Sequence, residues 1–361
     1  MDIVADHPPL PAAAPRTWLL LGPKPGDNGQ VLALAEALGW PFESKRMVYR
    51  STELLTNRLL GITLLGIDRR RSSPLEPPWP DLVISAGRRN EPVARWIRRK
   101  AEATKEVKLV HVGRPWAPLE SFDLIVTTPQ YALPEHPAVL HMEAPLHRVK
   151  PERLDEAACV WRPRLAALPM PRIAVMLGGH VGRWTFDDAA AVKLAEQANA
   201  MAEATGGSLL ISTSARTPAK VVESFVRTLR VPHHLYRWRR DDPENPYLGF
   251  LALADRIIVT SDSMSMLVEA VATGKPVFIF DLAAPREGAP WHLPSGRALI
   301  WWLGRIFGPR QLVRNVTAIH RGQVAAGRAI WLGEQWPKGR HAPPLTDTLR
   351  AANAVRKLFA V

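Results

Sequence analysis

The sequence predicts an α/β protein built from two parallel-sheet domains, each doubly wound. Three observations lead to this prediction. Short apolar runs alternate with segments of helical spacing, a pattern typical of strands joined by crossover helices. The alternation pauses in a proline-bearing stretch, 145–171, and then starts again. The chain has 361 residues, which is more than one hydrophobic core usually organises.

The first half contains the elements expected of one domain. Residues 1–16 are Pro/Ala-rich and are expected to form a disordered tail, and 17–150 to form an N-terminal Rossmann-like domain. Its strands are expected at 18–21, 42–48, 81–85, 107–112 and 122–127. Helical spacing predicts one helix over 30–38, which Gly39 ends, and another that reaches about residue 103.

The second half repeats the pattern. Residues 151–171, with a short helical segment near 153–168, are expected to link the domains. Residues 172–340 are expected to form a C-terminal Rossmann-like domain, and 341–361 to carry a final helix. Strands are expected at 172–177, 208–212, 234–238, 256–260 and 277–280, with helices at 187–205, 219–229 and 264–273.

Charge and cysteine content narrow the function classes. The net charge of +13 fits an anionic partner such as a nucleotide or an acidic membrane surface. The basic residues are spread over many elements and no nucleic-acid-binding motif accompanies them, so no specific nucleic-acid partner is expected. The single cysteine, Cys159, excludes a disulfide framework, and no signal peptide is visible, so a cytoplasmic protein is predicted.

The most informative segment is a polar turn between an apolar strand and a helix. Ser261, Asp262 and Ser263 follow the strand at 256–260, at the edge where parallel sheets bind ligands. Backbone N–H groups at a helix N-terminus suit a phosphate, and Glu269 further along the helix suits a sugar hydroxyl. The alternative is that these three residues only cap the helix.

Two more turns of the second half end strands in the same way. Gly178 and Gly179 permit close approach of a ligand or of the other domain. In the turn at 212–218, hydroxyl groups and Arg216 are typical of a diphosphate cradle, because a guanidinium offers paired hydrogen bonds.

Three turns of the first half carry polar residues at the corresponding positions. Candidates for ligand contact are expected in the turns at 22–30, 85–90 and 111–115, namely Asp27, Asn28, Gln30, Arg88, His111 and Arg114. An imidazole is half-charged near neutral pH and suits a general base, although a hydrogen-bonded structural histidine is the alternative for His111. No metal-binding pattern appears in the sequence, so no metal site is predicted.

Several of these segments together resemble the mitochondrial fission (elongated-mitochondria) family. The resemblance rests on Gly26-Asp-Asn-Gly-Gln30, Ile84-Ser-Ala-Gly-Arg88, Thr213-Ser-Ala-Arg-Thr-Pro218, Asn245-Pro-Tyr247 and the block from Val259 to Pro276. Bacterial members are described as glycosyltransferases, and the Ala/Arg/Pro-rich composition favours a bacterial source. The family is in turn similar to GT-B glycosyltransferases, which implies two Rossmann-like domains facing a cleft.

The resemblance also implies roles for the turn residues. The C-terminal domain would hold a nucleotide-diphosphate sugar through Gly178, Gly179, Ser214, Arg216, Ser261, Asp262, Ser263 and Glu269. The N-terminal domain would face the acceptor through Asn28, Gln30, Arg88 and Arg114, with His111 or Asp27 as the base. Ala215 stands where a second arginine is expected.

The resulting prediction is a glycosyltransferase that needs no cofactor or bound metal and uses an envelope or lipid-linked acceptor. The protein is expected to be cytoplasmic and to contact an anionic inner-membrane surface peripherally. A non-catalytic scaffold that binds a nucleotide or a partner protein is the alternative, because plant members of the family recruit a fission dynamin. A nucleotide-sugar epimerase is a third possibility.

Overall fold

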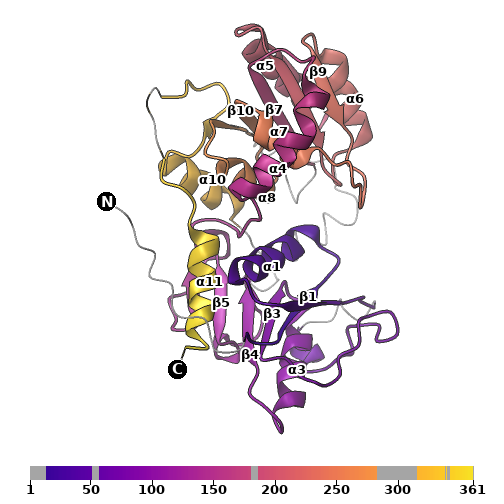
Figure 1. The fold of residues 1–361 in the computed structure, drawn as a ribbon, viewed down its shortest axis with the longest axis vertical. Coiled ribbons are helices and arrows are strands. Elements are labelled where there is room, and N and C mark those ends of the chain that lie inside the picture. The colour runs from indigo at the N-terminus through magenta and orange to yellow at the C-terminus, as the bar shows by residue number, and fades with distance from the viewer. Residues whose placement is uncertain are drawn as a thin grey trace, which may run out of the picture. The chain divides into compact units, whose positions relative to one another are not determined.

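The structure is a computed structural model, which describes residues 14–50, 57–179, 186–282, 315–337, 339 and 342–360. The chain divides into two compact units. Unit 1 comprises residues 1–148, 303–315 and 346–361, and unit 2 comprises 149–302 and 316–345. Each unit contains one six-stranded sheet in which every neighbouring pair of strands is parallel (Figure 1). The prediction of two parallel-sheet α/β domains is therefore confirmed; that they face a cleft stays a prediction.

The sheet of unit 1 has the strand order β2-β1-β3-β4-β5-β6. Its strands are β1 (Thr17–Leu21), β2 (Phe42–Arg46), β3 (Leu82–Ala86), β4 (Lys108–Val112), β5 (Leu124–Thr127) and β6 (Val139–His141). Its helices are α1 (Pro25–Leu38), α2 (Asn57–Leu60), α3 (Glu91–Ala101) and α11 (Asp347–Lys357), with short 3-10 turns η2 (Leu119–Ser121) and η3 (Pro129–Tyr131).

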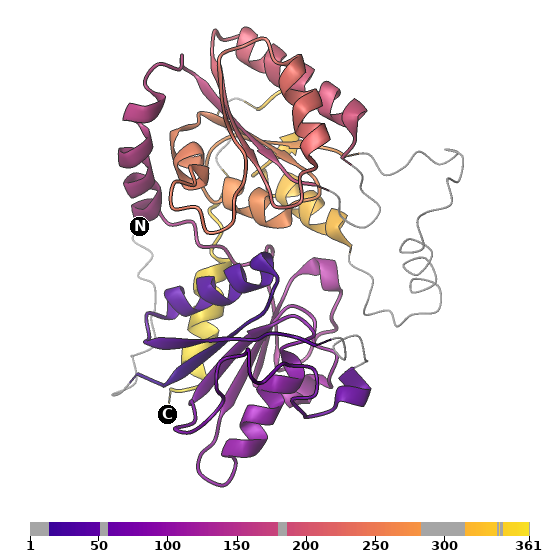
Figure 2. The ribbon, with the colours of Figure 1, turned by 90° about the vertical axis from the view of Figure 1, so that its right-hand side faces the viewer.

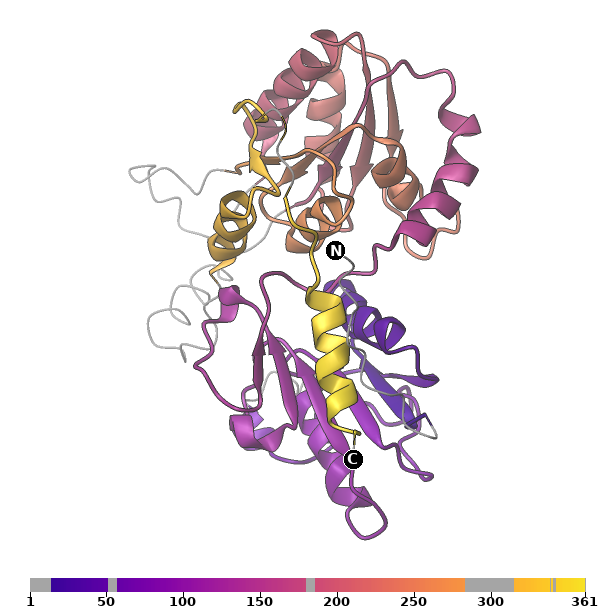
Figure 3. The ribbon, with the colours of Figure 1, turned by 60° about the vertical axis from the view of Figure 1, so that its left-hand side comes forward.

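Alternating side chains of the unit 1 strands pack on two helical layers. Leu19, Ile84 and Val110 face α1 and α11, which lie side by side on one face of the sheet (Figure 3). Trp18, Val83 and Leu109 face α3 on the other side. Because successive strand residues point to opposite faces, both sides of a central parallel strand must be apolar, as these runs are.

The sheet of unit 2 has the order β12-β11-β10-β7-β8-β9. Its strands are β7 (Arg172–Leu177), β8 (Ser208–Thr213), β9 (His233–Tyr236), β10 (Arg256–Thr260), β11 (Val277–Phe280) and β12 (Ile330–Trp331). Its helices are α4 (Pro151–Trp161), α5 (Asp188–Glu203), α6 (Ala219–Thr228), α7 (Tyr247–Leu253), α8 (Met264–Val271) and α10 (Val316–Ala325), and the 3-10 turn η4 (Pro163–Leu165) follows α4.

Helices cover both faces of this sheet as well. Residues of α5 and α6 pack with Ile173, Val175 and Leu209 on one face. Residues of α4, α7 and α8 pack with Ala174 and Met176 on the other face, and Figure 2 shows α4 and α5 on opposite sides of the sheet.

Three features differ from the sequence-based expectations. Residues 151–171, expected as a linker, contain α4, which packs on α7 and contributes Ala158 to the core of unit 2. The final helix, α11, contributes Val355 to the core of unit 1, so the last residues of the chain belong to its first unit. Helix α1 begins at Pro25 rather than near residue 30, because proline fits the first turn, where its missing N–H is not needed. Of the expected tail, residues 1–13 lie outside the described residues.

Candidate functional site

The strand order of each sheet has a switch point, where successive connections leave in opposite directions. In unit 2 it lies between β7 and β10, because β8 and β9 lie on one side of β7 while β10, β11 and β12 lie on the other. In unit 1 it lies between β1 and β3. Open parallel sheets bind ligands beyond the carboxyl ends of the strands at this point. The turns after β7 and β10, and those after β1 and β3, are therefore the candidate sites.

In unit 2, two glycines after β7 bring the neighbouring turns into close contact. A Cβ added to Gly178 would lie 2.1 Å from Asp262 Oδ1, and one added to Gly179 would lie 2.1 Å from the carbonyl oxygen of Arg216. Both distances are far below van der Waals contact, so only glycine fits at either position. The segments that approach this pair are the turns after β8 and β10 of the same sheet, whereas the sequence predicted a ligand or the other domain.

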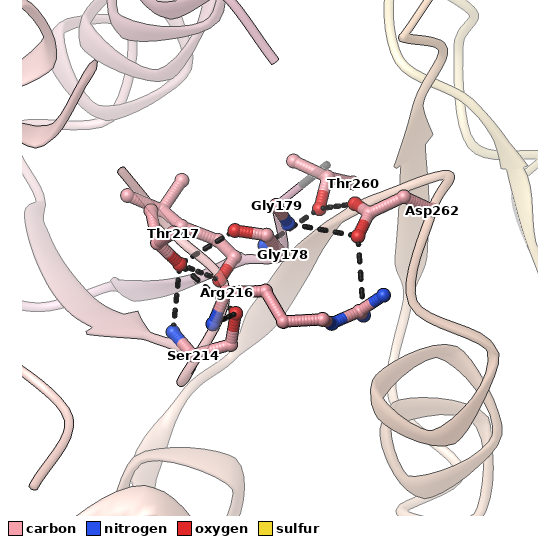
Figure 4. A network of polar contacts seen from close by, with 8 residues as sticks. Gly178, Gly179, Ser214, Arg216, Thr217, Thr260 and Asp262 are labelled. Atoms are coloured by element: carbon pink, nitrogen blue, oxygen red, sulfur yellow. Dashed lines mark hydrogen bonds and ion pairs between the residues drawn. The ribbon is translucent and has the colours of Figure 1, made fainter. Parts of the chain in front are cut away.

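Asp262 is the centre of the polar network drawn in Figure 4. Its Oδ2 accepts a hydrogen bond from the backbone N–H of Gly179 at 2.8 Å, and its Oδ1 accepts one from Thr260 Oγ1 at 2.7 Å. Its side chain is 0% exposed. Burial raises the pKa of Asp262, while the bonds from Gly179 and Thr260 and the charge of Arg216 act in the opposite direction.

Arg216 reaches the same carboxylate from the turn after β8. Its Nη2 lies 3.3 Å from Asp262 Oδ2, and its side chain is 46% exposed (Figure 4). Thr217 holds this turn in place, because its Oγ1 donates to the carbonyl oxygen of Gly178 at 2.5 Å and accepts from the N–H of Ser214 at 2.8 Å. Arg216 thus keeps about half of its surface accessible to an anionic ligand while one side is oriented by Asp262.

The serines beside Asp262 have different surroundings. Ser261 Oγ accepts from the N–H of Leu282 at 3.0 Å and lies 3.3 Å from Asp281 Oδ1, so its hydroxyl bonds to the turn after β11. Ser263 is the N-cap residue of α8, yet its side chain makes no capping hydrogen bond. The side chain of Ser263 therefore does not cap α8, contrary to the capping alternative for this turn.

Glu269 lies on α8 and is bound by a partly buried tyrosine. Tyr247 Oη donates to Glu269 Oε2 at 2.6 Å, and Asn245 Oδ1 accepts from the N–H of Tyr247 at 3.0 Å. Burial, followed by the charge of Glu269, raises the pKa of Tyr247 well above its ordinary value, so the phenol stays protonated. The Asn245-Pro-Tyr247 segment therefore orients the carboxylate that the sequence analysis assigned to a sugar hydroxyl.

Unit 1 has a cavity of about 300 Å³ at its switch point. Asp27, Asn28, Arg88 and Arg114, four of the residues predicted from the sequence, are among those that line it. The other lining residues lie after the ends of β1, β2, β3 and β4 and in η3, and they include Gly22, Lys24, Tyr49, Gly87, Arg89, Asn90, Gly113, Trp116 and Tyr131. Gln30 belongs to α1 but not to this lining.

Two asparagines fix the backbone around this cavity. Asn28 Oδ1 accepts from the N–H of Gly22 at 2.9 Å, and its Nδ2 donates to the carbonyl oxygen of Gly22 at 2.8 Å. Asn90 Nδ2 donates to the carbonyl oxygen of Leu20 at 2.9 Å, and its Oδ1 accepts from Tyr49 Oη. Asn28 therefore shapes the turn, and both polar atoms of its side-chain amide, Oδ1 and Nδ2, already bond to Gly22.

A buried glutamate fixes the third turn of the cavity. Glu91 is 0% exposed, and its Oε2 accepts from the N–H of Trp116 at 2.6 Å. Burial raises the pKa of Glu91, and the bond from Trp116 opposes that shift. This contact holds the 113–116 turn, and with it Arg114, at the edge of the cavity.

His111 does not lie where the sequence analysis expected. Its side chain is 0% exposed inside the sheet, with Nδ1 3.0 Å from Ser85 Oγ and the ring packed 5.1 Å from that of Phe122. Burial lowers its pKa to about 3, so the imidazole is neutral, and it does not belong to the cavity lining. A general base must reach the proton that it removes, so this placement corrects the assignment of His111 and gives it a structural role.

Several residues of both sites were missed from the sequence. Thr260 and Thr217 orient Asp262 and Gly178 through their hydroxyl groups, and Tyr49, Trp116 and Tyr131 bring aromatic surface to the cavity. Thr260 is the last residue of β10 and Thr217 lies in the turn after β8, so their place at the carboxyl edge of the sheet was an available signal. Tyr49 directly follows the strand expected at 42–48, so the same signal was available for it.

Comparison with known proteins identifies the family. The family model described as "Mitochondrial fission ELM1" matches residues 25–359. The chain belongs to this family. The resemblance inferred from the turn segments is thereby confirmed. The mitochondrial fission protein ELM1 of Arabidopsis thaliana is 28% identical over 325 residues, covering 84% of this chain and 69% of that protein. An uncharacterized protein of Rickettsia prowazekii, RP120, is 27% identical over 295 residues, covering 73% of this chain and 82% of its own.

Solved structures similar to this ELM1-family chain include enzymes that act on nucleotide sugars. The UDP-GlcNAc 2-epimerase of Neisseria meningitidis, bound to UDP-GlcNAc, has a TM-score of 0.49 at 12% identity, covering 95% of this chain and 99% of its own. A glycosyltransferase of Rickettsia africae has a TM-score of 0.43 at 12% identity, covering 95% and 98%. Among the residues that the structure describes, no helix has the length and apolar character needed to cross a membrane.

Proposed function

We propose that this ELM1-family protein is a GT-B-type glycosyltransferase, which moves a sugar from a nucleotide-diphosphate donor to an envelope or lipid-linked acceptor. The observation that carries the proposal is the unit 2 switch point, where a glycine pair, a half-exposed arginine and a helix N-terminus meet. These are the groups that bind a diphosphate without a metal ion. The predicted absence of a metal and of a cofactor is part of the proposal.

The donor would bind at the turns after β7, β8 and β10. Arg216, whose backbone carbonyl lies against Gly179, would stabilise the negative charge that builds on the leaving diphosphate. Ser214 and the first turn of α8, next to Ser261 and Ser263, would add hydrogen-bond donors. Asp262 would not touch the diphosphate but would hold Gly179 and Arg216 in position. Glu269, oriented by Tyr247, would accept a hydrogen bond from a sugar hydroxyl of the nucleotide.

The acceptor would bind in the unit 1 cavity. Asp27 is the only carboxylate in the lining that the structure describes, and its Oδ2 lies close to the backbone at Gly87. We assign Asp27 as the general base: it would remove the proton of the acceptor hydroxyl as that oxygen bonds to the donor sugar. The bond between the sugar and the diphosphate would break at the same time. Bringing the two sites within reach of each other is part of the proposal.

The charge of the protein supports an acceptor at a membrane surface. A net charge of +13 would attract the chain to anionic lipid, at roughly 1 kcal/mol for each basic residue close to the surface. A cytoplasmic protein held peripherally at the inner membrane would meet lipid-linked acceptors there.

One observation favours a second candidate function. The carboxylate of Asp262 already occupies the N–H of Gly179 and one side of Arg216, which are groups that a diphosphate would also use. Ala215 supplies no second guanidinium. A non-catalytic scaffold that has kept the fold and binds a nucleotide or a partner protein is compatible with such an internally satisfied site.

A ligand screen separates these functions. The intact protein is heated with UDP, GDP, ADP or CMP and with their sugars, and a true donor site should stabilise unit 2 by about 2.7 kcal/mol at one hundred times the dissociation constant. Transfer is then assayed with candidate acceptors, and Asp27→Asn should lower kcat by about 100-fold or more while leaving nucleotide binding unchanged. Binding without turnover would favour the scaffold, and interconversion of free nucleotide sugars would indicate an epimerase. If no nucleotide binds, the transferase proposal is wrong.

A further inference from the structure

The unit 1 cavity has a strong excess of positive charge. Its described lining includes four cationic side chains, Lys24, Arg88, Arg89 and Arg114, against the single carboxylate of Asp27. These cations come from three different turns, which the sheet brings to one edge. Like charges that converge on one cavity repel one another, so this arrangement is stabilised when an anion of more than one charge binds.

Arg114 is the cation most dependent on a ligand. Its side chain is half-buried in the turn after β4, and in the described part of the chain no hydrogen bond or ion pair engages its guanidinium. Two other partly buried arginines of unit 1 do have carboxylate partners: Arg98 pairs with Asp123 and Arg148 with Glu36. Burial lowers the pKa of Arg114, which reflects the same unfavourable loss of hydration. An oxyanion within reach would replace that lost hydration.

Aromatic rings line the same cavity. Arg88 lies over the ring of Trp116 at 5.0 Å and Arg89 over that of Tyr49 at 5.7 Å, while Tyr131 lies against Gly113. Indole and phenol rings offer flat apolar surface beside polar groups, which suits the apolar face of a sugar ring. A volume of about 300 Å³ is sufficient for one sugar residue with an attached phosphate group.

We propose that this cavity binds the phosphate or diphosphate group of a phosphorylated sugar acceptor. Arg114 is the principal residue that binds the phosphate, and the sugar ring lies beside Trp116. That the bound sugar is an acceptor rests on the proposed function, but the phosphate site itself does not depend on catalysis. A phosphate carries more negative charge than the carboxylate of an acidic sugar, so it matches a lining with four cationic side chains better. The phosphate group is shared by soluble sugar phosphates and by lipid-linked sugar diphosphates.

Inorganic pyrophosphate is the first probe, and it is titrated into the full chain by calorimetry at low salt. The Arg216→Gln variant is used as the background, so that the proposed donor site does not contribute. In this background, Arg114→Gln should weaken pyrophosphate binding about tenfold or more, since a charge-assisted hydrogen bond is lost. Arg114→Lys keeps the charge but not the paired hydrogen-bond geometry, so its affinity for pyrophosphate should lie between those of the background and of Arg114→Gln. Arg99→Gln, in the last turn of α3, is the matched control for loss of one exposed charge and should bind as the background does.

The second set of probes identifies the source of the phosphate. Glucose 1-phosphate tests a soluble acceptor, and vesicles with a polyprenyl diphosphate sugar test a lipid-linked one, against vesicles of phosphatidylglycerol alone. Binding of either phosphorylated sugar that Arg114→Gln weakens supports the proposal and names its source. Equal binding to both kinds of vesicle would show general attraction to anionic lipid and would overturn it.

The outcome for this site is separate from that for the donor site. The proposal is refuted if the Arg216→Gln background does not bind pyrophosphate at millimolar concentration, or if Arg114→Gln binds it as tightly as the background. Loss of nucleotide binding in Arg216→Gln with pyrophosphate binding retained supports both sites. Absence of nucleotide binding in the unaltered chain, with Arg114-dependent pyrophosphate binding, would reject the transferase and keep the phosphate site.

Discussion

Replacing His111 tests whether the histidine is a core residue. We expect His111→Gln to make the stability of unit 1 less dependent on pH. The imidazole is 0% exposed, and burial lowers its pKa from 6.5 to about 3. Between these values the unfolded chain binds a proton that the folded chain does not, so stability rises with pH through this window and is lost as pH falls.

The size of the effect follows from the two pKa values. With 6.5 in the unfolded chain and about 3 in the folded one, His111 makes the protein about 2 kcal/mol less stable at pH 5 than at pH 7. Glutamine is neutral, has a similar volume and can hydrogen-bond to Ser85, so its variant should lack this contribution. Other titrating groups contribute equally to both proteins and cancel in the difference.

Urea unfolding at pH 7 and pH 5 measures this difference. The transition to follow is the one that the substitution itself shifts, because the two units can unfold separately. The unaltered protein should lose about 2 kcal/mol more than His111→Gln between the two pH values. Equal losses would mean that His111 is protonated or hydrated in the folded chain, and would restore it as a candidate base.

The other predictions concern unit 2. Gly178→Ala should destabilise this unit by roughly 1–3 kcal/mol, because the new Cβ would lie 2.1 Å from Asp262 Oδ1, whereas Gly29→Ala, with no atom within 4 Å, should not lower the melting temperature. Asp262→Asn should bind a nucleoside diphosphate several-fold more tightly at low salt, because a negative charge beside the ligand is removed; weaker binding would instead make the Asp262 charge a requirement for binding. Glu269→Ala should weaken nucleotide binding more than it lowers the melting temperature of the free protein, and a loss of melting temperature alone would contradict its role in binding the sugar hydroxyl.

Much of the fold could be predicted from the sequence because the central strands of a parallel sheet are apolar on both faces. The runs at 172–177 and 256–260 match β7 and β10 at both ends. The short helical segment expected near 153–168 corresponds to α4, which begins earlier, at Pro151, because proline is favoured in the first turn of a helix. The sequence did not show that this helix packs in the core of unit 2. Strand β12 has two residues, too few for any periodicity.

The candidate sites were predictable only in part. The position of a turn relative to its strand brought Asp27, Arg88 and Arg114 to one cavity, since parallel strands end at the same edge. The direction of a side chain depends on strand register, which the sequence of one strand does not give. His111 lies on β4 before the turn, and its side chain points into the core instead of the cavity. Two partners of Asp262, Gly179 and Arg216, come from turns more than 40 residues away, and no local pattern indicates them.

The central claim is that the switch point of unit 2 binds the diphosphate of a nucleotide. Its most direct test is a calorimetric titration of the unaltered chain, Arg216→Gln and Arg227→Gln with the nucleoside diphosphate that ranks first in the screen. Arg227 is exposed in the last turn of α6 and controls for the loss of one positive charge. We expect Arg216→Gln to weaken binding about tenfold or more and Arg227→Gln to leave it unchanged. Equal affinities for all three proteins would contradict the claim.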